Sequence, residues 1–430
     1  MVILLCVVIG AGQVRGDDLV TLYDRIVETS PAARGAQYHA LAAEQAIQTA
    51  KREYRPRAAL NVDELWVEQN VDQTEIEALR SGSESFRNRR ALFEIEQPLF
   101  DATIRPRMRA AEARHRHRRY VAGHTAEQVG RTTIESYLAA ARLNSLLLSV
   151  DRVIARLESE EEVVQRMLDR QVATVEDAQI VKRSLVSMRR ERDALTYHLR
   201  LSLSRIGLRE VAAGWGALNE DADLARLEAA VPPVKDDPEI SELRMEITEL
   251  DHRMTAARRS GLPRFSLVGR YEYDDADNSV FGGAREIYGY EVGVALKWDL
   301  YQGGAVRSAI KELAYEKLAR EAELDALQQD HAHAIGSESM ALEQAERNLL
   351  HSETLLGHQA SIVEAAQRGY EAGTQTYISA LESFMLYESL LRDREEDRFD
   401  RLTLHIRRYA ATHGWTRDLA ALVNAYFQRE

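Results

Sequence analysis

The chain has 430 residues, a single cysteine and a formal net charge of −13 at pH 7. An acidic balance gives no electrostatic basis for binding nucleic acid, and one cysteine excludes both an intramolecular disulfide and a cysteine cage for a metal ion. The only long apolar run, residues 2–9, is far shorter than the roughly 20 residues that a membrane-spanning helix needs.

This N-terminal run resembles the apolar core of a secretory signal, because small residues follow it at Gly10, Ala11, Gly12 and Gly16. We therefore expect residues 1–16 to be a signal peptide and the rest of the chain to be exported. No Lys or Arg precedes the run, which leaves the true N-terminus and the cleavage site open. Cys6 is a poor candidate for lipid attachment, since Leu5 before it is too large for a lipobox.

Two prolines recur at a constant spacing. Pro31 and Pro56 are each followed by a counterpart 207 residues later, Pro238 and Pro263. A helical pattern lies between Pro31 and Pro56, and another lies between Pro238 and Pro263. In each copy a capping residue and a proline in the first turn mark the start of the helix, and the next proline marks its end. The sequence therefore predicts two structural repeats of helix, β-hairpin and helix, at residues 17–215 and 216–430.

An extended pattern follows each closing proline. We expect strands at about residues 57–70 and 88–100 in the first repeat and at about 264–274 and 287–301 in the second. The last strand is the most regular: its apolar side chains share one face, and small or charged ones share the other. The apolar face holds Tyr288, Tyr290, Val292, Val294, Leu296, Trp298 and Leu300.

This alternation is what a strand needs when lipid lies on one side and water on the other. Four aromatic residues near its ends, Tyr288, Tyr290, Trp298 and Tyr301, are expected at the membrane interfaces. A half-buried strand of a soluble sheet alternates in a similar way, so the pattern alone leaves both interpretations open.

Each predicted hairpin is followed by a long helix, at about residues 102–171 and 304–371, and by a return helix, at about 176–206 and 377–409. At 1.5 Å per residue each long helix would extend roughly 100 Å, and a helix of that length needs a partner helix to bury its apolar side. Heptad spacing supports a coiled coil. It appears at Leu143, Val150, Leu157 and Val164, and again at Ile335, Leu342, Leu349, Leu356 and Val363.

Three segments carry a likeness to a known family. They are Leu-Pro-Arg-Phe at 262–265, Trp-Asp-Leu-Tyr-Gln-Gly-Gly at 298–304, and Gly-Tyr-Glu-Ala-Gly-Thr-Gln-Thr at 369–376. In this order and spacing, and with the internal duplication, the chain resembles the TolC family of outer-membrane efflux proteins. The likeness covers nearly the whole predicted mature chain.

The resemblance implies a mainly α protein with transmembrane β-structure. Four strands from each of three protomers would form one 12-stranded barrel, continued by a long periplasmic α-helical coiled-coil barrel. It implies a homotrimer in the outer membrane of a Gram-negative-type bacterium, in contact with lipid and with a large periplasmic portion. Substrates would pass through it passively, delivered by an inner-membrane transporter through a periplasmic adaptor, a membrane fusion protein, in efflux or type I secretion.

The resemblance also implies roles for the two distal turns. It places the periplasmic gate at Tyr370, Gln375, Ser379 and Glu382, and adaptor docking at Val172, Ala173, Thr174, Gly373, Thr374 and Thr376. The chain departs from the family where Gln375 replaces an arginine, Ser379 replaces an acidic residue, and Gln171 stands where glycine is common. Glu382 is therefore the acidic constriction that we expect, with a solvated helix charge as its alternative.

No catalytic pattern stands out. His115 and His117 are two residues apart and point to different faces of a helix, which disfavours a metal site. We expect no enzyme activity, no cofactor, no metal and no nucleic acid partner. The alternatives are a soluble periplasmic coiled-coil scaffold or adaptor and, less well supported, an enzyme with a helical shell. The sequence does not indicate the cargo, whether drugs, metals or secreted proteins.

Overall fold

A computed structural model describes residues 18–71, 82–211, 215–218, 227, 238–278 and 283–427. The predicted signal peptide and residues 72–81, between the first two predicted strands, lie outside these residues. The described chain divides into two compact units, one of residues 1–36, 122–237 and 328–430, the other of residues 37–121 and 238–327. Among the described residues, no helix combines the length and the apolar character that crossing a membrane requires.

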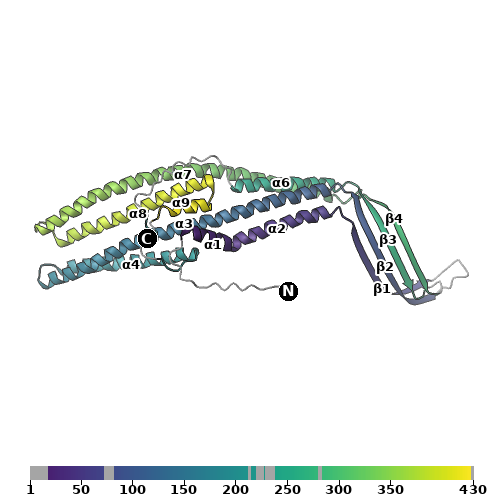
Figure 1. The fold of residues 1–430 in the computed structure, drawn as a ribbon, viewed down its shortest axis with the longest axis horizontal. Coiled ribbons are helices and arrows are strands. Elements are labelled where there is room, and N and C mark those ends of the chain that lie inside the picture. Colours follow the sequence, from purple (N-terminus) through teal and green to yellow (C-terminus); the bar gives the residue numbers. More distant parts are fainter. Residues whose placement is uncertain are drawn as a thin grey trace. The chain divides into compact units, whose positions relative to one another are not determined.

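The elements alternate between helices and hairpins along the chain (Figure 1). In order they are α1 (Leu19–Thr29), α2 (Pro31–Arg52), β1 (Arg57–Val71), β2 (Gly82–Phe100), α3 (Ile104–Asp169), α4 (Val175–Arg205), α6 (Pro238–Arg259), β3 (Arg264–Ala276), β4 (Arg285–Lys297), α7 (Ala305–Glu371), α8 (Tyr377–His413) and α9 (Arg417–Asn424). The mainly α fold with four strands is therefore confirmed. The repeat boundary at residues 215 and 216 stays a prediction.

The four strands form one antiparallel sheet in the order β1-β2-β3-β4 (Figure 1). The register places residues of the same character opposite one another. Leu60 pairs with Phe93, Phe93 with Tyr271, and Tyr271 with Tyr290. Because side chains alternate between faces along a strand, this register gives the whole sheet one apolar and one polar face.

β4 is shorter at its C-terminal end than the alternation predicts. We expected the strand to continue to about residue 301, but it ends at Lys297, which pairs with Arg264. The residue before Arg264 is Pro263, which has no N–H to extend the ladder. Trp298 instead donates its indole N–H to the carbonyl of Gly261 at 3.1 Å.

β2 also differs from expectation, since it begins at Gly82 rather than near residue 88. The first residues of β2 are mostly polar and do not alternate with apolar ones, so the sequence does not mark them as a strand. They are extended because they pair with β1. Near its other end β2 contains Pro98, where the register with β3 shifts. A bulge is one of the few places in a sheet that tolerate proline.

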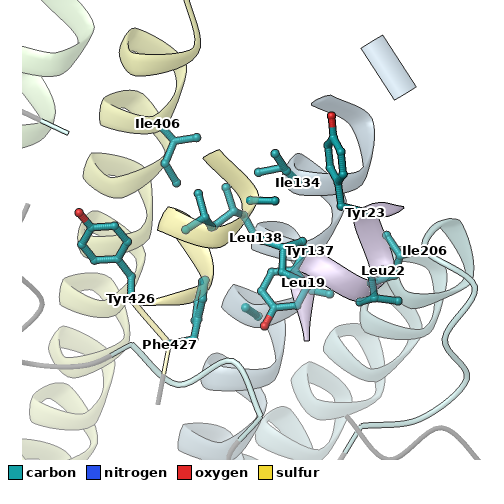
Figure 2. Close-up of a cluster of buried hydrophobic side chains, with 14 of the residues drawn as sticks. Leu19, Leu22, Tyr23, Ile134, Tyr137, Leu138, Ile206, Ile406, Tyr426 and Phe427 are labelled. Atoms are coloured by element: carbon teal, nitrogen blue, oxygen red, sulfur yellow. The ribbon is translucent and has the colours of Figure 1, made fainter. Parts of the chain in front are cut away.

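The first unit holds a core built from segments far apart in the sequence (Figure 2). Leu19 and Leu22 of α1 are fully buried with residues of α3, α4, α8 and α9. The Tyr23 hydroxyl donates to the carbonyl of Trp415 at 2.7 Å. Gly130 of α3 allows this approach, because a Cβ there would lie 2.5 Å from the Tyr23 ring.

A second cluster of the same unit follows the predicted heptads. Val150, Leu157 and Val164 of α3 are at most 1% exposed, packed with α4 and with the first turns of α8. On α7 the heptad residues Leu342, Leu349 and Leu356 are buried, as are the small residues Ala345, Ser352 and Ala366 three positions after heptad sites. These faces of the long helices are therefore packed, as the period predicts.

Candidate functional site

The apolar face of the sheet spans all four strands of the second unit. Most of its residues are exposed in the single chain, and β4 is exposed along its whole length. The face comprises Ala58, Leu60, Val62, Ala91, Phe93, Ile95, Phe265, Leu267, Gly269, Tyr271, Tyr273, Tyr288, Tyr290, Val292, Val294 and Leu296, together with the polar Gln97 opposite Leu267. On β4 it runs nine residues, from Tyr288 to Leu296, which is about 27 Å at the rise of an extended strand.

A row of charged residues ends this face on the loop side. Glu64, Arg89, Asp275 and Glu286 are successive register partners across the four strands, and Arg89 lies 3.5 Å from Glu64 and 3.7 Å from Asp275. At the helix side the face ends near Phe100 and Phe265, whose rings are 6.3 Å apart. The apolar face is therefore a band bounded along the strands.

The opposite face of the sheet is held by ion pairs and hydrogen bonds. Asp274 is buried at 5% exposure, with Arg90 at 3.4 Å and Arg285 at 3.2 Å. Four residues closer to the helices along β3, Arg270 lies 3.4 Å from Glu94. Charged side chains that face one another in this way suit a surface in contact with water.

The two outer strands leave hydrogen-bonding groups without a neighbour in the sheet. β1 and β4 are its edges, with 15 and 13 residues. Long exposed edges are templates for pairing with another chain. In the single chain, therefore, the two edge strands lack a pairing strand and the apolar face lacks a covering layer.

The distal turns of the first unit have the same backbone geometry in both halves of the chain. After α3, the N–H groups of Gln171 and Val172 donate to the carbonyls of Leu168 and Met167 at 2.9 Å each. After α7, those of Gly373 and Thr374 donate to Tyr370 and Gly369 at 3.0 and 2.8 Å. Both are Schellman turns, which place one residue in the left-handed region.

That left-handed residue is Gly373 in one turn, with φ of 72°, and Gln171 in the other, with φ of 58°. A residue with a Cβ is strained there by about 1–2 kcal/mol. The departure from glycine seen in the sequence therefore leaves the turn intact, since the two hydrogen bonds after α3 still form.

Threonine caps the helix that follows each turn. The Thr174 hydroxyl accepts from the Asp177 N–H at 3.1 Å, and the Asp177 carboxylate accepts from the Thr174 N–H at 2.8 Å. The Thr376 hydroxyl accepts from the Ser379 N–H at 3.2 Å. Ser379 thus occupies the position that Asp177 has in the first capping box.

The predicted gate residues lie around the second turn. The Tyr370 ring packs edge-on against Tyr377, with centroids 5.4 Å apart. Gln375 folds over Gly369, where a Cβ would lie 3.0 Å from the Gln375 side chain. Glu382 is exposed, and within the described chain no cation lies at ion-pair distance from it.

The predicted adaptor residues are at the surface of both turns. Val172 is 71% exposed, and Thr174, Gly373, Thr374 and Thr376 are exposed as well. Ala173 is half-buried and packs against the cluster that contains Ile378 and Leu381 of α8. The first-half turn therefore contacts the same cluster as the start of α8.

Several ion pairs and one cation–π contact between α3 and α8 were not predicted from the sequence. Arg142 lies 2.8 Å from Asp400 and 3.1 Å from Glu396, and the Arg156 guanidinium lies 5.8 Å from the centre of the Phe384 ring. The partners are more than 200 residues apart and have no local signature.

The comparisons with known proteins agree with this geometry. Residues 234–386 match the family model of the outer membrane efflux proteins. The predicted resemblance to the TolC family is confirmed. The matched segment contains β3, β4, α7 and the second distal turn. No curated protein matches the sequence.

Solved structures share the TolC-family fold over nearly the whole chain. The outer membrane protein VceC of Vibrio cholerae is 13% identical, with a TM-score of 0.74 over 92% of this chain and 96% of that one. A membrane protein of Pseudomonas aeruginosa is 15% identical, with a TM-score of 0.75 over 92% of each chain. The outer membrane channel CmeC of Campylobacter jejuni is 11% identical, with a TM-score of 0.75 over 96% and 87%.

Proposed function

We propose that the protein is an outer-membrane channel that three copies of this chain form together. It conducts substrates passively, after an inner-membrane transporter has delivered them through a periplasmic adaptor. The observation that carries the proposal is the sheet of the second unit, with an apolar band on one face, ion pairs on the other and two open edges.

The height of the band supports contact with lipid. About 27 Å of apolar strand, bounded by charges at one end and aromatic rings at the other, is close to the roughly 25 Å band of transmembrane barrels. The nine residues from Tyr288 to Leu296 also match the 9–11 residues of a typical membrane strand. The two tyrosines at positions 288 and 290 would lie at one interface, and Trp298 and Tyr301 near the other.

The open edges support oligomerisation. An unpaired strand edge is not tolerated in hydrocarbon, because each unsatisfied N–H or C=O costs several kcal/mol. Four strands are too few to close a barrel alone, whereas β1 of one copy can pair with β4 of the next. Three copies supply 12 strands, the number that the family resemblance implies.

A soluble periplasmic scaffold is the competing function. It accounts for the coiled coil of the first unit but gives no role to an exposed apolar face on all four strands. The two functions predict different locations and masses. In denaturing gels of unheated outer membranes, we expect a species of about three times the mass of the chain. A monomer confined to the soluble periplasm would refute the channel.

The distal turns support a gate and docking surface in this channel. Glu382 is exposed beside the turn, and no cation of the described chain neutralises it. Repeated around a threefold axis, it would form a ring of negative charge. Val172 and the threonines of the two turns would offer the adaptor an exposed surface with a fixed backbone.

Replacing Glu382 with Gln is expected to lower the cation selectivity of the channel. A narrow ring of like charges concentrates counter-ions, and the amide keeps the shape while removing the charge. The measurement is the reversal potential in planar bilayers under a salt gradient. Glu364→Gln, which removes an exposed carboxylate of α7, is the matched control. Equal reversal potentials for Glu382→Gln and the wild type would exclude Glu382 from the gate.

A further inference from the structure

A pocket of about 290 Å³ lies in the second unit where the strands meet the helices. It is lined by the ends of β1, β2, β3 and β4, by the start of α3 and by Glu53 after α2. Four cationic side chains from three strands and one helix reach it: Arg57, Arg107, Arg264 and Lys297. Neither the fold nor the proposed conduction assigns a role to this pocket.

Three carboxylates also line the pocket, and each already has a partner. Glu53 pairs with Arg107 at 3.3 Å. Glu96 accepts a hydrogen bond from the Ser266 hydroxyl at 2.7 Å. Asp101 accepts from both the N–H and the hydroxyl of Thr103, at 2.8 and 2.7 Å, before α3 begins.

The cations are less completely paired than the carboxylates. Arg264 lies 3.3 Å from Asp299. Arg57 and Lys297 are exposed, and no carboxylate of the described residues lies within ion-pair distance of either. Arg107 and Arg264 therefore each have a carboxylate partner, and Arg57 and Lys297 are the two cations of the lining that have none among the described residues.

The register places two of these cations directly opposite one another. Arg264 and Lys297 are cross-strand partners at the last position of the β3–β4 ladder. Like charges directly opposite in a sheet destabilise the pairing. Asp299 offsets the charge of Arg264 at 3.3 Å, whereas Lys297 has no such partner among the described residues, so an anion beside Lys297 would lower the remaining repulsion.

The cations of the pocket lie on the polar side of the sheet, although Phe100 and Phe265 at the end of the apolar face also line it. Arg57, Arg264 and Lys297 have the same register parity as Ser266 and Glu96, opposite to Val292 and the apolar band. In the proposed channel the polar side faces the conduit, so a solute could reach the pocket. This placement, though not the binding itself, rests on the proposed function.

We propose that this pocket binds a phosphoryl group. Arginine presents a planar fork of donors that matches phosphate oxygens, and lysine adds a compact charge. The group could come from a phosphorylated or inorganic solute in the conduit or from the headgroup of an anionic phospholipid. Both sources present phosphoryl oxygens to the cations of this pocket.

The test is calorimetric titration of the full-length protein in detergent with inorganic phosphate at constant ionic strength. The variant is Arg57→Gln/Lys297→Gln, and the control is Arg307→Gln/Lys311→Gln, which removes two exposed cations of α7 in the same unit. We expect the first variant to bind phosphate at least about tenfold more weakly, since each charge-assisted bond is strong. The control is expected to bind like the wild type.

A second arm distinguishes the two sources. The wild type and both variants are reconstituted with phosphatidylglycerol or phosphatidylcholine, and retained lipid is measured by mass spectrometry after detergent exchange. If phosphate fails to bind but phosphatidylglycerol is retained by the wild type and lost by Arg57→Gln/Lys297→Gln, the group is a lipid headgroup. If neither anion binds, or if that variant binds both like the wild type, the proposal is overturned.

The outcome does not depend on whether the protein conducts ions. Conductance recorded in a phosphate-free chloride salt tests the channel alone. A conducting protein that binds no phosphoryl group would refute only the pocket, and binding without conductance would refute only the channel. The single variant Arg57→Gln, tested in parallel, keeps the pocket testable if the double variant fails to fold.

Discussion

Replacing Val292 with Arg is expected to prevent the protein from assembling in the outer membrane, whereas Gly293→Arg is expected to be tolerated. Val292 lies at the middle of the apolar run of β4, two register steps of its face from both Tyr288 and Leu296. An arginine at the centre of a barrel's lipid face costs about 2–4 kcal/mol, and a trimer would carry three. Gly293 lies on the polar face, where an added Cβ meets no atom within 4 Å.

The two variants are closely matched. Both residues are neighbours on an exposed strand, and Val292 is 75% exposed in the single chain. A soluble protein would therefore accept arginine at either position. The measurement is the amount of heat-dissociable trimer in purified outer membranes. Equal amounts for the two variants would show that the apolar band does not face lipid.

Replacing Phe399 with Ala is expected to lower the free energy of unfolding by about 3–5 kcal/mol. Phe399 of α8 is 2% exposed and is among the largest fully buried side chains. It joins the core that holds α1, α3, α8 and the C-terminal segment, where its ring lies 6.4 Å from that of Phe427. The loss combines reduced burial with the cavity that remains.

The control for this core is Leu386→Ala on the same helix, because Leu386 is 52% exposed. Urea denaturation of both variants in detergent, followed by circular dichroism, gives the two midpoints. We expect a large shift for Phe399→Ala and at most a small one for the control. Similar midpoints would mean that the first unit's core does not limit stability.

The features that the sequence predicts well have local causes. Pro31 and Pro238 begin α2 and α6, each of 22 residues, because proline suits the first turn of a helix. The heptads of α3 and α7 predict their buried faces, since packing depends on a period of a few residues. The alternation of β4 predicts its two faces for the same reason.

Features that depend on distant partners were beyond the sequence. The end of β4 at Lys297 depends on its register with β3, whose preceding residue is Pro263. The pairing of Arg142 with Asp400 joins residues 258 positions apart. Arg142 and Asp400 are charged residues like many exposed ones on these helices, so nothing in the sequence distinguishes them as an ion pair.

The candidate site likewise has some features that the sequence predicts and others that only the structure shows. The likeness of the second distal turn to the family identified Tyr370 and Glu382 as candidates, and their gating role stays a prediction. Gln171 shows what the structure adds: its left-handed backbone demonstrates that the turn forms without the expected glycine. The phosphoryl pocket depends on cations from three strands and a helix, which only the register brings together.

Single-channel conductance of the purified protein in a planar bilayer, recorded alongside its mass in detergent, tests the central claim most directly. The channel predicts a trimer that inserts and gives small, cation-selective currents, because the resting entrance is narrow and carries a ring of Glu382. A protein that neither trimerises nor inserts would contradict the channel, and the soluble scaffold would then be the better explanation of its coiled coil.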